Sequence, residues 1–137
     1  MQFALRIEAT AAVNAAQVDV LQKIPEILKA ADIDVVYNAV GVGATARQSI
    51  ELVKHGGTLV WIGLSNDEEK IPIGKIVFKE IDIRGMFRYA NMYPRAINLV
   101  QKGIIDLKSL ITKRVAFEEI PAIMPKIANG EIRASKP

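Results

Sequence analysis

The sequence predicts an α/β fold with a mostly parallel sheet. Apolar runs rich in β-branched residues alternate along the chain with segments whose apolar residues recur at helical spacing, a pattern typical of βαβ units. The stretch 33–63 shows this best, with two apolar runs that end at Gly41 and Gly63 and flank a helical pattern. Because parallel sheets bind ligands at the carboxyl ends of their strands, the search for a site begins at these two glycines.

The elements are assigned in order from the period of their apolar residues. The amino-terminal part predicts a short helix over 1–9, a short strand over 11–14 and an amphipathic helix over 18–31. Pro25 marks either the start of that helix or a kink in it. The central unit then comprises a strand over 33–40, a helix over 44–54 and a strand over 58–62.

Beyond Gly63 the pattern weakens. A polar loop over 65–70 leads to a short extended piece over 71–73, where Pro72 favours a sheet edge or a non-strand segment, and to one or two helical turns over 74–79. A third good strand covers 80–87. Helices over 92–102 and 118–129, each with an early proline, flank a strand predicted over 110–117.

Composition excludes several classes of protein. The chain has 137 residues, half of them apolar, which suits one ordinary domain. The net charge of +3 comes from scattered lysines and arginines, which argues against nucleic acid as a partner. Without cysteine, and with His55 as the only histidine, the sequence offers neither a disulfide framework nor a zinc ligand set. No apolar run is long enough for a membrane span, and the start lacks signal-peptide features, so we expect a soluble, cytoplasmic protein.

One glycine turn has the pattern of a dinucleotide fingerprint. Residues 41–46, Gly-Val-Gly-Ala-Thr-Ala, fit G-x-G-x-x-G/A after a strand and at the start of a helix. Asp67 follows near the distance expected for a ribose-binding acid. The alternative is an ordinary strand-to-helix turn elsewhere in such a sheet.

Several longer pieces carry a family resemblance: 34–41 (Asp-Val-Val-Tyr-Asn-Ala-Val-Gly), 56–64 (Gly-Gly-Thr-Leu-Val-Trp-Ile-Gly-Leu), 80–89 (Glu-Ile-Asp-Ile-Arg-Gly-Met-Phe-Arg-Tyr), 93–97 and 110–114. In order and spacing they resemble the C-terminal, nucleotide-binding part of the zinc-dependent medium-chain alcohol dehydrogenases. The piece Gly85-Met-Phe-Arg-Tyr89 is similar to the sorbitol (polyol) dehydrogenase branch.

The resemblance implies a partial doubly wound, Rossmann-type sheet that lacks its first two strands. Gly41 would then end the fourth strand, and the true fingerprint turn would precede Met1. Residues 1–137 would form a truncated dinucleotide-binding domain, with 110–137 returning toward a missing catalytic domain. The strand over 35–40 would become an exposed edge, open to pairing with another chain.

The resemblance also implies the site residues. Val40 and Gly41 would pass near the adenosine side of NAD, and the nicotinamide ribose would be lined by Ile62, Gly63 and Leu64. The nicotinamide would be flanked by Phe87, Arg88 and Tyr89. Arg133 would lie near the phosphates. Arg88 and Tyr89 would also reach the substrate. No catalytic residue or metal ligand is assigned within the chain.

The implied family reaction is hydride transfer from a secondary alcohol, such as a polyol, to NAD, with NADP left open and with zinc held by residues absent here. The fragment alone is expected to be inactive. Two alternatives stay open: a non-catalytic module that self-associates or binds a partner, and a small nucleotide-binding protein that uses Gly41-Val42-Gly43 as its phosphate turn. A homo-oligomer is expected, through the edge at 69–73 or the edge at 35–40.

Overall fold

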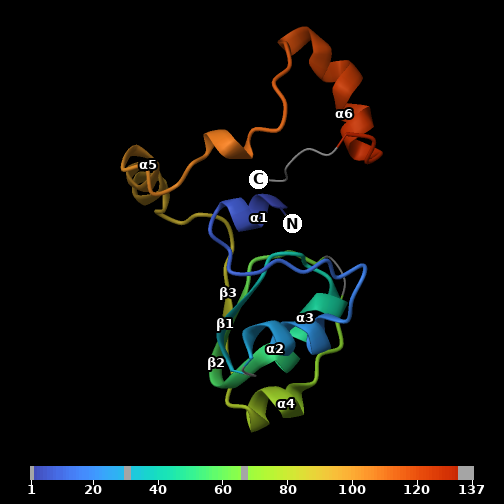
Figure 1. Ribbon diagram of the computed structural model, residues 1–137, viewed down its shortest axis with the longest axis vertical. Helices are drawn as coiled ribbons and strands as arrows, with labels where there is room; N and C mark the ends of the chain where they lie inside the picture. Colours follow the sequence, from blue (N-terminus) through green and yellow to red (C-terminus); the bar gives the residue numbers. More distant parts are fainter. Residues whose placement is uncertain (1, 30–31, 66–67, 133–137) are drawn as a thin grey trace. The chain divides into compact units, whose positions relative to one another are not determined.

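The computed structural model describes residues 2–29, 32–65 and 68–132. The chain divides into two compact units, Met1–Arg88 and Tyr89–Pro137. The first holds α1 (Gln2–Arg6), α2 (Val20–Leu28), β1 (Ile33–Asn38), α3 (Gly43–Leu52), β2 (Val53–Trp61), α4 (Ile73–Phe78) and β3 (Asp82–Gly85) (Figure 1). The second holds α5 (Tyr93–Gln101), α6 (Ile120–Ala128) and the 3₁₀ turns η1 (Lys108–Leu110) and η2 (Phe117–Glu119).

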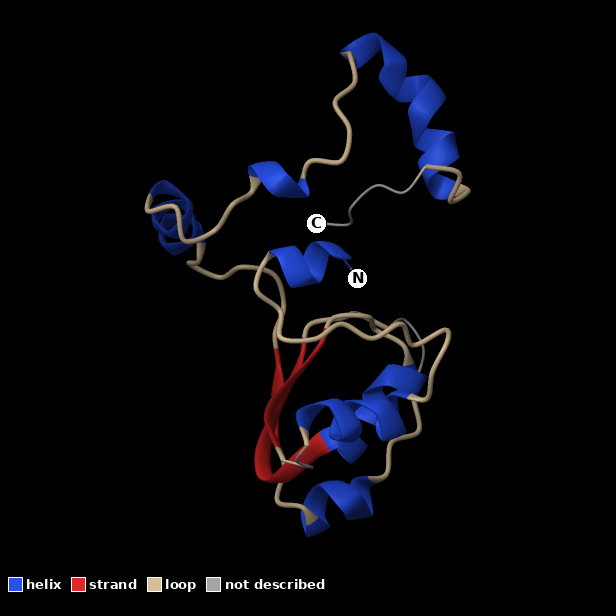
Figure 2. Cartoon of the chain, viewed as in Figure 1, coloured by secondary structure: helices blue, strands red, loops and turns tan. Residues whose placement is uncertain are grey.

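The sheet has three strands in the order β1-β2-β3, and both pairs are parallel. Val36 lies opposite Leu59, which lies opposite Ile83, so these three side chains share one face. Helices α2, α3 and α4 lie on one side of the sheet (Figures 1 and 2). The predicted Rossmann-like α/β fold, with its central βαβ unit, is confirmed.

The core lies between the sheet and these helices. Ile50, Val53 and Leu59 are fully buried and pack with Ile81. Four half-buried side chains complete the cluster: Val36, Trp61, Ile71 and Ile76. The C-terminal part of the crossover helix α3 therefore packs onto the sheet through Ile50, beside Val53 at the start of β2.

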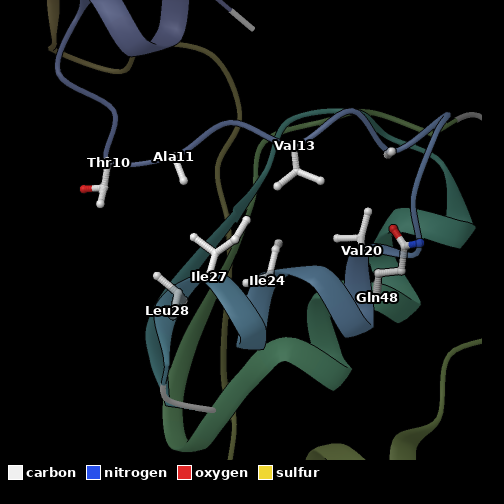
Figure 3. A pocket seen from close by; sticks show the side chains of 9 residues that line it. Thr10, Ala11, Val13, Val20, Ile24, Ile27, Leu28 and Gln48 are labelled. Carbon is white, nitrogen blue, oxygen red and sulfur yellow. The ribbon is translucent and has the colours of Figure 1, made fainter.

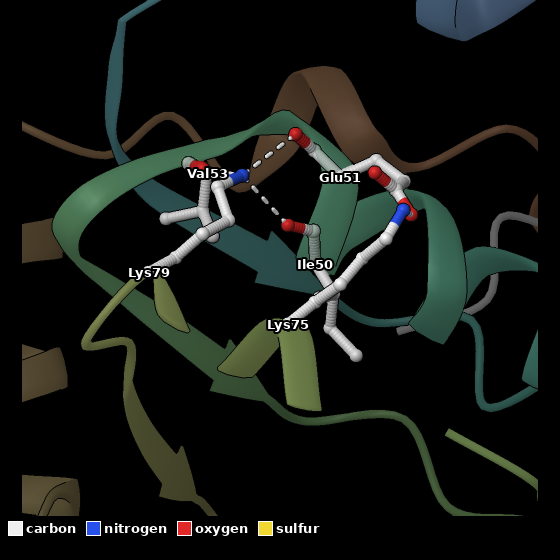
Figure 4. Close-up of polar contacts among 5 residues, drawn as sticks. All are labelled: Ile50, Glu51, Val53, Lys75 and Lys79. Atoms are coloured by element: carbon white, nitrogen blue, oxygen red, sulfur yellow. Dashed lines mark hydrogen bonds and ion pairs between the residues drawn. The ribbon is translucent and has the colours of Figure 1, made fainter. Parts of the chain in front are cut away.

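A lysine caps the C-terminus of α3 (Figure 4). The Lys79 ammonium donates hydrogen bonds to the carbonyls of Ile50 at 3.0 Å, Glu51 at 2.9 Å and Val53. The last carbonyls of a helix lack partners within the helix, and a cation there also complements the helix dipole. Nearby, Lys75 of α4 forms an ion pair with Glu51. These contacts hold α4 against the end of α3.

The strand predicted over 11–14 is wrong. These residues form no strand, and in the described part of the chain β1 has β2 as its only strand neighbour. A strand needs a partner for its backbone groups, and local sequence preference cannot supply one. Instead, the segment from Thr10 to Ala15 and α2 border a largely apolar cavity of about 480 Å³, lined by Ala11, Val13, Val20, Ile24, Ile27 and Leu28 among others (Figure 3).

The strand predicted over 110–117 is also wrong. η1 ends at Leu110, residues 111–116 have no regular secondary structure, and η2 begins at Phe117. The second unit contains no sheet among residues 89–132, so the β-branched residues here have nothing to pair with. For the short piece over 71–73, Pro72 suggested a sheet edge or a non-strand segment; the structure shows the non-strand segment, and α4 begins at Ile73.

The other predicted elements are present with shifted ends. α2 runs through Pro25, so this proline lies inside the helix and does not mark its start; Asp19 caps the helix by accepting a hydrogen bond from Leu21 N–H at 2.9 Å. Pro125 likewise lies inside α6.

In the described ranges, no helix combines the length and the apolar character needed to span a membrane.

Candidate functional site at the strand ends

The turns that follow β1 and β2 are in backbone contact. A Cβ atom on Gly63 would lie 2.2 Å from the backbone nitrogen of Gly41, and a Cβ on Gly41 would lie 2.3 Å from the carbonyl oxygen of Leu64. Gly41 also has a φ of +76°, which favours glycine. The structure thus brings together the two glycines that the sequence singled out. Position 63 requires glycine because the backbone of Gly41 approaches too closely to leave room for a side chain.

Asn38, at the end of β1, holds the two turns together. Its carbonyl oxygen accepts hydrogen bonds from Ile62 N–H at 2.9 Å and Gly63 N–H at 3.0 Å. Its side-chain oxygen accepts from Val40 N–H at 3.1 Å and from the Thr45 hydroxyl at 3.3 Å. The residue is only 6% exposed, so these bonds form largely out of water and restrict both turns.

Apolar side chains surround the paired turns and are open to solvent. Val40 is 65% exposed, Leu64 is 72% exposed, and Ile62 is also exposed. Such side chains at the carboxyl ends of two parallel strands offer a surface on which a ligand can pack. All five residues predicted for this part of the site, from Val40 to Leu64, therefore come from two turns in contact.

The segment after β3 begins beside the end of β2. Met86 N–H donates a 2.8 Å hydrogen bond to the carbonyl of Trp61. Two residues on, Arg88 has a φ of +57°, in the left-handed region that is unusual for a long side chain. Its guanidinium carbon lies 4.7 Å from the centre of the Phe87 ring. The structure places Phe87 and Arg88 as exposed groups just past the end of β3.

Tyr89 begins the second unit, where its ring packs edge-on against Tyr93 with 5.1 Å between ring centres. Arg133 and the acid Asp67 lie outside the described residues.

The contact of Glu69 with the first turn of α3 was not predicted from the sequence. Its carboxylate accepts a 2.9 Å hydrogen bond from Gly43 N–H, the first residue of α3, across 26 residues of sequence. Together with Asn38, Trp61 and the turn glycines, it lines a cavity of about 200 Å³. No local pattern marks Glu69, whereas Asn38, a polar residue closing an apolar strand, could have been found from the sequence.

An ion pair joins Asp34 and Lys54 near the amino end of β1, at the other end of this strand from the site. The hydrogen bond and charge of Lys54 lower the pKa of Asp34, and Asp34 raises the pKa of Lys54. In the described segments, no group of three or more His, Cys, Asp or Glu side chains could hold a metal ion. The residues present therefore do not fit a zinc centre.

Comparisons with known proteins identify the family of this chain. The family model described as zinc-binding dehydrogenase matches residues 1–102. The chain is 33% identical over 127 residues to sorbitol dehydrogenase from Bacillus subtilis, covering 92% of this chain and 36% of that protein. It is 40% identical over 79 residues to L-arabinitol 4-dehydrogenase from Aureobasidium melanogenum, covering 58% of this chain and 22% of that protein.

A solved structure gives the same result. A zinc-binding dehydrogenase from Sinorhizobium meliloti 1021, bound to NADP, superposes with a TM-score of 0.83 at 32% identity, covering 90% of this chain and 37% of that one. The chain thus spans little more than a third of the length of the Bacillus subtilis and Sinorhizobium meliloti relatives. Since the family model covers well over half of its residues, the chain belongs to the zinc-binding dehydrogenase family.

Proposed function

We propose that this chain is the NAD(P)-binding portion of a polyol or alcohol dehydrogenase, and that the dinucleotide lies across the paired turns after β1 and β2. One observation carries the proposal: Gly41 and Gly63 meet in backbone contact at the carboxyl ends of parallel strands, with exposed apolar side chains around them. Ligands of open α/β sheets bind at this edge. The relative from Sinorhizobium meliloti that superposes on the chain is bound to NADP.

The chain's own residues would bind and orient the cofactor. Val40, Ile62 and Leu64 supply apolar contact, and Arg88 supplies a cation past β3. The assignment of Arg88 and Tyr89 as polyol contacts, and of Arg133 to the phosphates, stays a prediction from the family resemblance. When bound, the cofactor accepts or donates a hydride. Because the chain holds no zinc ligand set, we expect no alcohol oxidation by the chain alone. A cytoplasmic location belongs to the same proposal.

The test is calorimetric titration of NAD, NADH, NADP and NADPH into the purified chain. Leu64→Ala removes an exposed apolar contact at the proposed site, and we expect about fivefold weaker binding, since roughly 1 kcal/mol of burial is lost. Val77→Ala is the matched control, because Val77 is equally exposed at 71% but lies on α4. Equal affinities for the two variants would contradict the proposed placement.

Arg88→Ala tests the segment after β3 in the same titration, and we expect weaker binding there as well. A loss of binding in Gly43→Val with full binding in Leu64→Ala and Arg88→Ala would instead favour the alternative phosphate turn. Absence of any binding by the wild-type chain would refute cofactor binding by this portion.

A second candidate, self-association, rests on the free edge of β1. Val35 and Tyr37 are exposed, and the described residues supply no strand beyond β1. Bare strand edges pair readily with another chain. The predicted alternative edge at 69–73 is less suitable, because Glu69 contacts α3 and Ile71 packs on the core.

We expect Val35→Lys to lower the mass of the associated species in sedimentation. Lys70→Ala, in the other candidate edge, should leave it unchanged. A lower mass in Lys70→Ala with an unchanged mass in Val35→Lys would place the interface at 69–73. A monomeric wild-type chain would refute self-association.

A further inference from the structure

The first turn of α3 holds a carboxylate from a distant part of the chain. Gly43 N–H donates to Glu69 at 2.9 Å, while Val42, the residue that precedes the helix, makes no side-chain cap. A Cβ atom at position 43 would lie 1.7 Å from a Glu69 oxygen. The Glu69 carboxylate therefore fills the space that any side chain at position 43 would need.

A guanidinium flanks the same carboxylate. Arg47, one turn further along α3, places its Nη1 3.6 Å from Glu69 Oε2, and this nitrogen also donates to the carbonyl of Lys70 at 3.3 Å. Helix N-terminal N–H groups and an arginine are the groups that bind phosphate in proteins. Here they bind an anion that belongs to the chain itself, and about a third of that side chain, 34%, is exposed.

We propose that Glu69 acts as an internal anion that closes the Gly41-Val42-Gly43 turn to phosphate. Because Glu69 is tethered, its effective concentration at the turn is on the order of millimolar or higher, and a free phosphate must compete with it. The turn thus has the sequence of a phosphate fingerprint but is held in a self-occupied state. Withdrawal of Glu69 frees an anion site formed by Gly43 N–H and Arg47. The proposed anion site uses Gly43 and Arg47, whereas the proposed cofactor placement uses Gly41 and Gly63.

Thermal unfolding in increasing inorganic phosphate tests the proposal, at constant ionic strength. Glu69→Ala empties the turn; Glu68→Ala removes the same charge from the neighbouring exposed residue, which has no contact described, and serves as the control. We expect saturable stabilisation by phosphate in Glu69→Ala and none in wild type or Glu68→Ala over the same range of concentrations. The gain in phosphate affinity should be at least about tenfold, the equivalent of one charge-assisted hydrogen bond. Adding Arg47→Ala to Glu69→Ala should abolish the gain.

Glu69→Gln covers the case in which the alanine variant does not fold, because it keeps the shape of the side chain without its charge. In this variant, phosphate should shift the amide resonance of Gly43 in ¹⁵N spectra, whereas in wild type it should not. Equal responses of the Glu69 and Glu68 variants would overturn the proposal. So would saturable phosphate binding at Gly43 in the wild-type chain.

Discussion

The contact between the two glycine turns makes a specific prediction about stability. In Gly63→Ala the new methyl group would lie 2.2 Å from the backbone nitrogen of Gly41 and within 2.8 Å of the carbonyl carbons of Val40 and Ala39. All three are backbone atoms, which cannot swing aside as a side chain can. Overpacking of this kind costs roughly 1–3 kcal/mol. We expect a value near the upper end, about 3 kcal/mol, because the Asn38 hydrogen bonds to Ile62 and Gly63 resist separation of the turns.

Gly85→Ala is the matched control. Gly85 ends β3 as Gly63 follows β2, neither has a positive φ, and a Cβ on Gly85 meets no atom within 4 Å. Alanine there should stabilise the protein by roughly 0.4–1 kcal/mol, because the unfolded chain loses freedom. The two substitutions, identical in chemistry, should therefore differ by about 3–4 kcal/mol.

Urea unfolding followed by circular dichroism measures this difference. With a slope of roughly 1.5 kcal/mol per molar urea, the midpoint of Gly63→Ala should fall about 2 M below that of wild type at an unchanged slope. The Gly85→Ala midpoint should stay the same or rise slightly. If the midpoints of the two variants agree within error, the turns are not in the contact described, and the reasoning about the site fails with it.

Three further outcomes follow from the described contacts. Lys79→Met should lower the free energy of unfolding by about 2–3 kcal/mol, because three carbonyls at the end of α3 lose their charged donor. Lys75→Met removes an exposed ion-pair partner and should lower it by less than about 1 kcal/mol. Equal losses in the two variants would contradict the capping role of Lys79. Asn38→Leu should cost about 1–3 kcal/mol in the same assay, since Val40 N–H loses its acceptor, and a neutral result would mean that water replaces it. Their pairing lowers the pKa of Asp34 and raises the pKa of Lys54. The stabilisation that the ion pair contributes is therefore lost as pH falls through the folded-state pKa of Asp34, and also as pH rises through the folded-state pKa of Lys54. Melting temperatures of Asp34→Asn should therefore vary less with pH at both extremes than those of wild type, and parallel curves would refute the linkage.

The sequence predicted elements well wherever local pattern and tertiary context agree. The unit from β1 to β2 is marked by β-branched runs and glycines, and its outer ends lie close to the predicted ones, although β2 already begins at Val53 and not at 58. The segment 110–117 also contains β-branched residues, and 11–14 contains only Val13; neither forms a strand. Pairing depends on a neighbour in space, which a run of valines and isoleucines does not guarantee.

The same distinction applies to the site. Gly41 and Gly63 could be found because each glycine follows an apolar strand, and the sheet brings these ends together. Glu69 could not, because its contact with Gly43 spans 26 residues and depends on how the segment after β2 returns to α3. The fingerprint pattern at Gly41-Val42-Gly43 consequently looked like an open phosphate turn, whereas the structure shows it holding a carboxylate.

The position of Trp61 gives the protein a built-in optical reporter. It is the only tryptophan in the sequence, it lies at the end of β2 against the core, and its indole N–H is buried without a hydrogen-bond partner among the described residues. Its emission should therefore be blue-shifted in the native state and should report on the strand ends alone. Reduced nicotinamide absorbs where indole emits, so energy transfer from Trp61 to bound NADH would report the distance between cofactor and sheet without any label. Emission from this single residue thus links the folding of the first unit and the occupancy of its strand ends in one signal.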